Sequence, residues 1–232
     1  MSAELLRVLS KMDNLVDWEA TDRAAGITTD LLPMRDLLER AGHPQRTFRT
    51  VHIAGTKGKG SVGALIEAGL ASAGLSCGRY SSPHVETVTE RVTFGGQNIA
   101  GSALARALER AMLIRFEAAH AGTPGGNATR FDIETLAAIL AFQEAGVEWA
   151  IVECGLGGRH DSTNVIDAEL AILTNVGLEH TTVLGDTHAA IAYQKVGILK
   201  PGATMITGVE PDSEAGGVVR AAAEALGSPA IY

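Results

Sequence analysis

Short apolar runs alternate with amphipathic, helix-like segments along most of this chain. The runs are apolar at consecutive positions, which is typical of strands that are buried on both faces of a sheet. We predict these strands at residues 50–54, 77–81, 149–153, 168–174 and 203–207, with a further one beginning at 230–232. We predict helices at residues 3–11, 31–41, 62–73, 102–120, 134–145, 188–198 and 217–226.

The order of these elements predicts an α/β fold. Strands that alternate with helices form a mostly parallel sheet with helices on both faces. The segment 89–97, which contains the pair Gly95-Gly96, predicts a small hairpin beside that sheet. The sequence shows no internal repeat and no low-complexity linker. We therefore expect one domain at 50–232, to which residues 1–49 are appended as a helical segment.

A glycine-rich segment joins the first predicted strand to its helix. It reads Gly55-Thr56-Lys57-Gly58-Lys59-Gly60-Ser61. A strand, a glycine-rich loop and a helix in this order form a phosphate-binding site, where backbone N–H groups, the helix N-terminus and a lysine face the anion. The strict pattern GxxxxGK followed by Ser or Thr is not met, because Ile53 occupies the position of its first glycine. The alternative interpretation is a mobile basic turn.

Polar side chains follow other predicted strands at the edge of the sheet where such folds bind ligands. Glu153 ends an apolar strand, a position typical of a carboxylate that holds Mg²⁺ beside a phosphate loop. Ser82 and His180 follow two further strands. Each residue has an ordinary alternative, namely an exposed acid, a turn serine and a structural histidine. Because all three, with Ser61, follow strands at one edge, we expect them to share a site.

The composition limits the classes of protein to which this sequence can belong. A hydrophobic fraction of 46% with 20% charged residues is ordinary for a globular domain, and the formal net charge of −8 argues against a nucleic-acid-binding protein. The sequence has neither a signal peptide nor an apolar run that could span a membrane. Cys77 and Cys154 lie in apolar runs and predict buried thiols rather than a disulfide. We expect a soluble, cytoplasmic protein.

Seven blocks together carry a resemblance to a known family. They are HIAGTKGKGS, YSSPH, TERVTFGGQ, TRFDIET, VECGLGGRHDSTNVI, TNVGLEHTTVLG and AYQKVGILKPG. Over about residues 27–208 the chain resembles the folylpolyglutamate synthase/dihydrofolate synthase family, which belongs with the ATP-dependent muramyl peptide (Mur) ligases. The stretch GLGGRHDSTNVI is the block that points to the folate branch. The resemblance implies the P-loop NTPase-like central domain of a Mur ligase.

This resemblance implies sites for ATP and for two Mg²⁺ ions. The residues implied around the ATP phosphates are Gly55, Thr56, Lys57, Gly58, Lys59, Gly60 and Ser61. The residues implied around Mg²⁺ are Ser61, Ser82, Glu153 and His180. Lys195 matches a lysine that the family carbamylates, so that a cation becomes an anion able to bind a second Mg²⁺. The alternative for Lys195 is a solvated helix lysine. Lys59, Lys195 and His180 are the implied catalytic residues.

The resemblance also implies a pterin pocket. Its implied residues are Phe131, Asp132, His160, Asp161 and Ser162, with residues 27–31 closing over them. The implied reaction begins when the carboxylate of dihydropteroate or of a folate glutamate tail attacks the ATP γ-phosphate. The acyl phosphate that forms is then attacked by the amine of L-glutamate. Lys59 and the metal ions stabilise the charge on the phosphoryl oxygens.

Two features depart from the family pattern. Lys57 replaces the usual Asn of the loop, and the sequence stops at Tyr232, before the family's C-terminal ligase domain. A fragment, a truncated homologue or a site completed by another polypeptide would each fit, and we expect no complete ligation by this chain alone. Two other functions stay open: a muramyl peptide ligase, which RHDSTN argues against, and a nucleotide-binding module without ligase activity.

Overall fold

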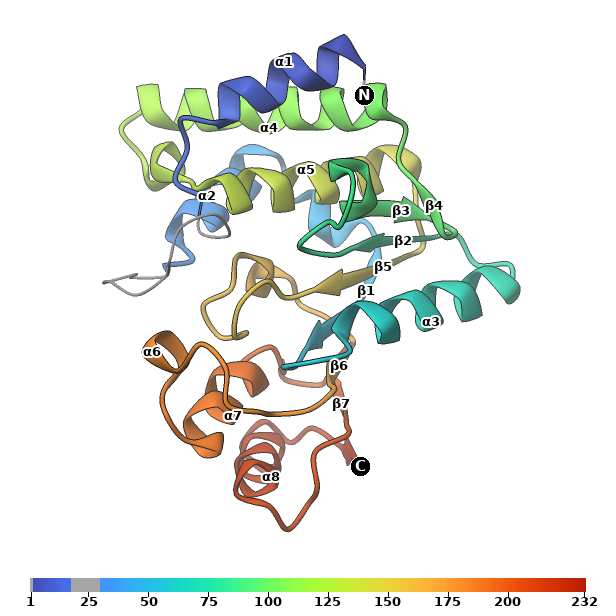
Figure 1. Cartoon of the computed structure of the whole chain (residues 1–232), viewed down its shortest axis with the longest axis vertical. Coiled ribbons are helices and arrows are strands. Elements are labelled where there is room, and N and C mark those ends of the chain that lie inside the picture. Colours follow the sequence, from blue (N-terminus) through green and yellow to red (C-terminus); the bar gives the residue numbers. More distant parts are fainter. Residues whose placement is uncertain (1, 18–29) are drawn as a thin grey trace.

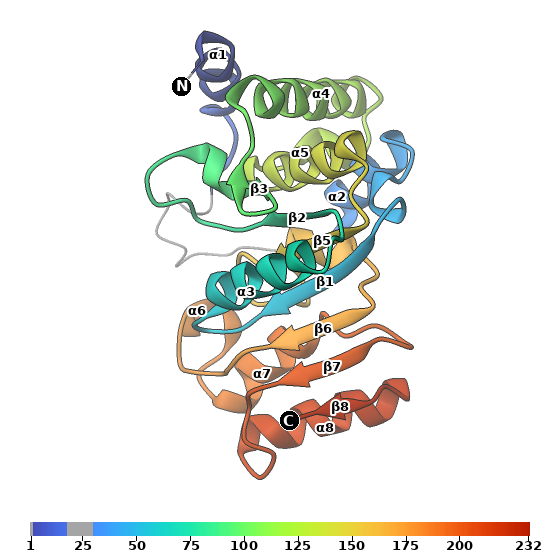
Figure 2. The same ribbon diagram turned by 90° about the vertical axis from the view of Figure 1, so that its right-hand side faces the viewer.

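An eight-stranded sheet forms the centre of the protein, known here from a computed structural model that describes residues 2–17 and 30–232. The strands lie in the order β4-β3-β2-β5-β1-β6-β7-β8 (Figures 1 and 2). Their bounds are β1 Arg49–Ala54, β2 Cys77–Tyr80, β3 Val92–Phe94, β4 Gln97–Asn98, β5 Trp149–Glu153, β6 Leu170–Leu173, β7 Thr204–Thr207 and β8 Ala230–Ile231.

Six of these strands run parallel, and the hairpin runs against them. Parallel pairs join β2 to β5, β5 to β1, β1 to β6, β6 to β7 and β7 to β8. β3 pairs antiparallel with β2 and with β4. The predicted hairpin is therefore confirmed, and Gly95 and Gly96, both with positive φ, form its turn. Because the other strands are parallel, their carboxyl ends meet at one edge of the sheet.

Helices cover both faces of the sheet, as predicted. Their bounds are α1 Ala3–Met12, α2 Leu32–Arg40, α3 Lys59–Ser72, α4 Gly101–His120, α5 Arg130–Ala145, α6 Thr181–Leu184, α7 His188–Val196 and α8 Glu214–Leu226. α3 packs on one face, and α5, α7 and α8 pack on the other (Figure 2). The alternation along β5 shows the two faces, because Ile151 packs with α3 while Ala150 and Val152 pack with α5.

α1 and α2 belong to the same hydrophobic core as α4 and α5. Leu5, Val8 and Met12 of α1 are fully buried, and α1 packs on α4 outside the α5 layer (Figure 1). The division of the chain at residue 50 stays a prediction. Within residues 2–17 and 30–232, no helix is long and apolar enough to cross a membrane. Cys77 and Cys154 are buried and free, as expected.

Several helices differ from the prediction, among them α8, which begins at Glu214 rather than at 217. α3 begins at Lys59 and α5 at Arg130, each several residues earlier than predicted, and the short α6 was not predicted at all. The early start of α5 has a local cause. Thr129 accepts a hydrogen bond from the backbone N–H of Asp132, while the Asp132 carboxylate accepts one from the backbone N–H of Thr129. This reciprocal capping satisfies N–H groups of the first helical turn.

A buried carboxylate on α3 holds the hairpin against the sheet. Glu67, only 2% exposed, accepts hydrogen bonds from Arg79 Nε at 2.9 Å, Thr93 Oγ1 at 2.8 Å and the Gly96 backbone N–H at 2.9 Å. Charge-assisted bonds of this kind are stronger than neutral ones. The Glu67 carboxylate therefore joins α3, β2, β3 and the hairpin turn, a role that the sequence did not reveal.

Candidate active site

The phosphate loop occupies the turn between β1 and α3. Gly58 immediately precedes α3 and has φ 81°, in the left-handed region that favours glycine. The helix then begins at Lys59, so that Gly60 and Ser61 lie in its first turn, where backbone N–H groups have no partner within the helix. These N–H groups and the partial positive charge of the helix end suit a phosphate group. The predicted strand, loop and helix are confirmed, but the loop is shorter than expected.

Residues that follow β6 brace this loop. The backbone carbonyl of Lys57 accepts hydrogen bonds from Thr174 Oγ1 at 2.7 Å and from Asn175 Nδ2 at 2.9 Å, and the Lys57 N–H donates to Asn175 Oδ1 at 3.0 Å. Gly55 has φ 153°, and a Cβ there would lie 1.8 Å from Thr174 Oγ1. The sequence prediction missed Thr174 and Asn175, although their position directly after β6 was a usable signal. Their hydrogen bonds to the Lys57 backbone argue against the alternative of a mobile turn.

Lys59 lies between the loop and the neighbouring strand. Its Nζ donates a hydrogen bond to the Gly55 carbonyl at 3.1 Å and lies 3.8 Å from Glu153 Oε1. A Cβ on Gly60 would lie 3.5 Å from Glu153 Oε2, so the first turn of α3 also faces this carboxylate. Lys59 and Glu153 therefore meet at the edge where the phosphate group is expected.

Glu153 and Ser82 lie at the carboxyl ends of neighbouring parallel strands. Tyr80 pairs with Val152 in the sheet, so β2 and β5 end next to each other, with Ser82 two residues beyond Tyr80 and Glu153 at the end of β5. Burial raises the pKa of Glu153 to about 7, against the opposing charges of Lys59 and Arg79. Ser82 Oγ is buried and has no hydrogen-bond partner. The alternative of an exposed acid is therefore wrong, because Glu153 is 7% exposed.

These two side chains fit a Mg²⁺ ion. The cation prefers oxygen ligands, would give Ser82 Oγ a partner, and would favour the ionised form of Glu153. Ser61 is exposed in the first turn of α3, and His180 is exposed at the start of α6 with φ 46°. In the described part of the chain, no three His, Cys, Asp or Glu side chains form a metal-binding group. The complete predicted ligand set stays a prediction.

Lys195 is a buried lysine with an acidic partner. Its Nζ lies 2.8 Å from Glu179 Oε1, and the residue is 1% exposed, so the alternative of a solvated helix lysine is wrong. Burial lowers the pKa of Lys195, although the hydrogen bond that its Nζ donates to Glu179 opposes this change. A lower pKa favours the neutral amine, which is the form that can be carbamylated. Carbamylation itself stays a prediction.

Three of the predicted pterin residues come together. Ser162 Oγ donates a hydrogen bond to Asp132 Oδ1 at 2.6 Å, and the ring of Phe131 lies against Gly155, where a Cβ would be 2.6 Å from its Cζ. Asp161 is buried in the loop itself and accepts a hydrogen bond from the Leu156 N–H at 2.7 Å. His160 is exposed. Of the predicted closing segment 27–31, residues 27–29 lie outside the described residues.

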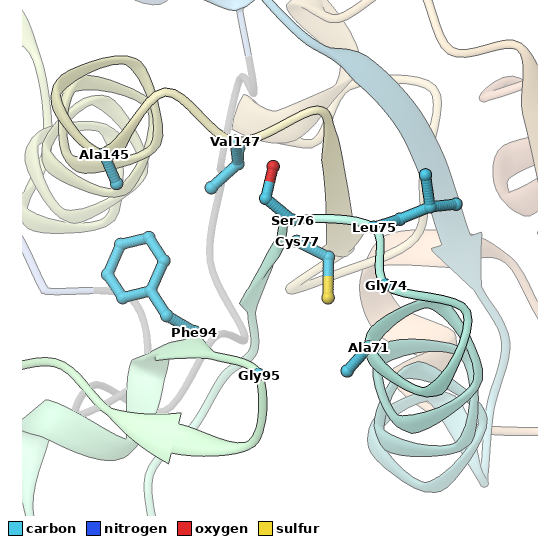
Figure 3. A pocket seen from close by; sticks show the side chains of 9 residues that line it. All are labelled: Ala71, Gly74, Leu75, Ser76, Cys77, Phe94, Gly95, Ala145 and Val147. Atoms are coloured by element: carbon cyan, nitrogen blue, oxygen red, sulfur yellow. The ribbon is translucent and has the colours of Figure 1, made fainter.

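A pocket of about 490 Å³ lies away from these residues. Its lining is shown in Figure 3 and consists of Ala71, Gly74, Leu75, Ser76, Cys77, Phe94, Gly95, Ala145 and Val147. Cys77 begins β2, so the pocket is at the amino end of this strand. The predicted active-site residues lie at the opposite, carboxyl end. This pocket is therefore separate from the phosphate loop.

The raised pKa of Glu153 gives a test by pH. Because this carboxyl titrates at about 7 when folded and near 4.3 when unfolded, the folded state binds more protons between these values. The free energy of unfolding should then fall as pH rises from about 5 to about 7. We expect the Tm of the wild type to fall relative to that of Glu153→Gln over this range without Mg²⁺. If the difference in Tm between the wild type and Glu153→Gln is the same at both ends of this pH range, the assignment is contradicted.

Comparisons with known proteins agree with this geometry. Residues 53–225 match the family model described as the Mur ligase middle domain. The dihydrofolate synthase/folylpolyglutamate synthase of Bacillus subtilis (strain 168) is 40% identical over 205 residues, covering 88% of this chain and 47% of that protein. The chain thus spans about half the length of this relative.

Solved structures show the same relationship. The apo form of L. casei FPGS has a TM-score of 0.86 and 33% identity, covering 98% of this chain and 53% of the other. An FPGS-AMPPCP-folate complex has the same TM-score of 0.86, 33% identity and coverage of 98% and 53%. The match of the family model over most of the chain and these structural similarities lead to one conclusion. The chain belongs to the Mur ligase family through its middle domain and is similar to the family's folylpolyglutamate and dihydrofolate synthases.

Proposed function

We propose that this chain supplies the ATP-binding domain of an ATP-dependent ligase that adds L-glutamate to dihydropteroate or to folate glutamates. The observation that carries the proposal is the arrangement at the sheet edge, where the phosphate loop, Lys59 and Glu153 converge and Ser82 follows the neighbouring strand β2. The folate class of substrate is supported by the relatives, since one of the similar structures is an FPGS-AMPPCP-folate complex.

The proposed chemistry has two steps. A substrate carboxylate oxygen attacks the γ-phosphorus, and ADP leaves, giving an acyl phosphate. The amine of L-glutamate then attacks the acyl carbon, an amide bond forms, and inorganic phosphate leaves as the amine loses a proton. Mg²⁺, when bound, would neutralise negative charge on the phosphoryl oxygens.

The chain's own residues hold and orient the phosphates. Backbone N–H groups at the start of α3 bind the phosphate oxygens, and Lys59 provides a full positive charge. Ser61, Ser82, Glu153 and His180 would hold Mg²⁺, and Lys195 would bind a second ion if carbamylated. Phe131, Asp132 and Ser162 would contact the pterin ring, beside Asp161 and His160. Held in this way, the substrate would present its carboxylate to the γ-phosphate.

A muramyl peptide is the other substrate class of the family, and a nucleotide-binding module without ligase activity is the other functional class. Calorimetric titration of the purified chain separates these possibilities. We expect binding of Mg·AMPPCP and of dihydropteroate or tetrahydrofolate, and no binding of a UDP-linked muramyl peptide. Failure to bind Mg·AMPPCP would overturn the nucleotide site. Binding of the nucleotide with neither pteridine would leave only the binding module.

A further inference from the structure

A series of buried hydrogen bonds connects β1 to the loop that carries the candidate pterin residues. His52 on β1 is 0% exposed, and its Nε2 lies 2.8 Å from Oγ1 of Thr163. Thr163, in the 3₁₀ helix Ser162–Val165, donates its hydroxyl hydrogen to Asp161 Oδ1. We refer to His52, Thr163 and Asp161 as the relay. None of these side chains takes part in the phosphate loop.

The direction of these hydrogen bonds follows from their chemistry. Both Asp161 oxygens already accept hydrogen bonds from backbone N–H groups, those of Leu156 at 2.7 Å and Thr163 at 3.0 Å. The single hydroxyl hydrogen of Thr163 goes to Asp161, so its oxygen accepts from the Nε2–H of His52. His52 Nδ1 then carries no hydrogen, and it is buried without a partner. Burial lowers the pKa of His52 to about 3, which keeps this ring neutral.

At its Asp161 end, the relay joins two parts of the same loop by hydrogen bonds. Asp161 binds the N–H groups of Leu156 and Thr163, which lie on either side of it in the sequence. The next residue, Ser162, donates to Asp132 at the start of α5. The position of Ser162 against Asp132 therefore depends on the conformation that the relay imposes on residues 155–165.

Other hydrogen bonds also hold this loop, on either side of Asp161. It contains Gly155, Gly157 and Gly158, and glycine has little backbone preference of its own. Three of these bonds come from α7 and the residues after it: the Arg159 N–H donates to the Gln194 carbonyl at 2.7 Å, Asn164 Nδ2 donates to the Gly197 carbonyl at 3.1 Å, and Lys200 Nζ donates to the Asn164 carbonyl at 2.9 Å. These bonds hold Arg159 and Asn164, whereas the relay holds Asp161 and Thr163 between them.

We infer that His52 is a positioning residue that orders the 155–165 loop and thereby sets the affinity for the pteridine substrate. The inference rests on the proposed function for its choice of ligand. His52 is fully buried, so it acts through Thr163 and Asp161 rather than by touching the substrate. Since β1 is held in the sheet by β5 and β6, its histidine gives the loop a fixed point of attachment.

Variants of the relay test this inference in the full chain. His52→Leu and Thr163→Val each remove a hydrogen-bonding group at nearly constant volume, while His52→Gln and Thr163→Ser keep one. We expect roughly 5- to 20-fold weaker calorimetric binding of dihydropteroate for the first pair and largely restored binding for the second pair. Mg·AMPPCP affinity should stay within about twofold of the wild type, because His52 and Thr163 lie outside the phosphate loop.

A matched control separates positioning from general destabilisation. Thr93→Val makes the same change at another buried hydroxyl, which bonds Glu67 far from the loop. This control should lower the Tm but leave dihydropteroate affinity unchanged. Equal pteridine affinity in wild type, His52→Leu and Thr163→Val would overturn the inference. The inference would also be overturned if all variants, including the control, lost affinity for dihydropteroate and for Mg·AMPPCP to the same extent.

Amide hydrogen exchange measured by NMR tests the relay without any ligand. In His52→Leu the N–H groups of Leu156 and Thr163 should exchange faster, while those of β1 keep their wild-type rates. Unchanged exchange at both loop amides would overturn the inference even if pteridine affinity fell. Failure of the wild type to bind any pteridine would instead remove the proposed function. Exchange rates would then decide whether the relay orders the loop.

Discussion

Alanine in place of Lys59 is expected to weaken the binding of Mg·AMPPCP by about 10- to 100-fold or more, because a full positive charge is lost beside the phosphates. At about 4 Å and an effective dielectric constant near 20, such a charge contributes up to about 4 kcal/mol. Partial exposure of the lysine to solvent lowers this value. The Nζ of Lys59 is already held by the Gly55 carbonyl and faces Glu153, so the charge is in place before nucleotide arrives.

Lys57→Ala is the matched control for this measurement. Lys57 lies in the same loop and has the same formal charge, but it is exposed, and the contacts that hold it involve its backbone. We expect its loss to change nucleotide affinity by no more than about threefold, since exposed charges are screened. Calorimetry that finds the same affinity for Lys59→Ala and wild type would refute the assigned role. A larger loss in the control would refute it too.

The Glu67→Ala variant is expected to lose about 3–5 kcal/mol of folding free energy, because it removes one member of a buried ion pair. Arg79 would lose its partner at 2.9 Å, and the Thr93 hydroxyl and the Gly96 N–H would lose their acceptor. Denaturant unfolding followed by circular dichroism measures this loss. The hairpin should also separate from α3, which hydrogen exchange of β3 and β4 would detect as faster opening.

Glu144→Ala provides the comparison. Its carboxylate lies 3.4 Å from Arg106 Nη2, but both side chains are more than half exposed. Exposed pairs contribute about 0–1 kcal/mol, so this variant should unfold almost like the wild type. Similar stability losses for the two variants would show that burial of the Glu67 carboxylate does not decide its energy.

The parts of the fold that the sequence predicted well are those governed by local patterns. Consecutive apolar positions identified β5 and β6, and glycine next to a strand identified the phosphate loop. The rule that ligands bind at the carboxyl ends of parallel strands led to Ser82 and Glu153, which lie at the ends of the neighbouring strands β2 and β5. Helix starts were less accurate, because the first turn of α5 depends on the capping pair of Thr129 and Asp132 rather than on apolar periodicity.

Contacts between residues distant in sequence could not be predicted. Glu67 and Thr93 belong to different elements, and so do His52 and Thr163. The sequence around each residue gives no signal of its hydrogen-bond partner. Lys195 illustrates the same limit, because its helix pattern does not show that Glu179 will meet it in the interior. Buried polar groups need partners, but only the tertiary structure decides which partners they find.

The hydrogen bonds between the phosphate loop and the residues after β6 also affect the conformational entropy of the loop. Fixing the backbone of one residue costs roughly 1–2 kcal/mol in conformational entropy. For Lys57 this cost is met during folding, since Thr174 and Asn175 hold its backbone by hydrogen bonds within the protein. Nucleotide affinity is thereby linked to the folding equilibrium of a strand end more than a hundred residues away in the sequence. Substitutions of Thr174 or Asn175 would then alter ATP affinity without removing a direct contact with ATP.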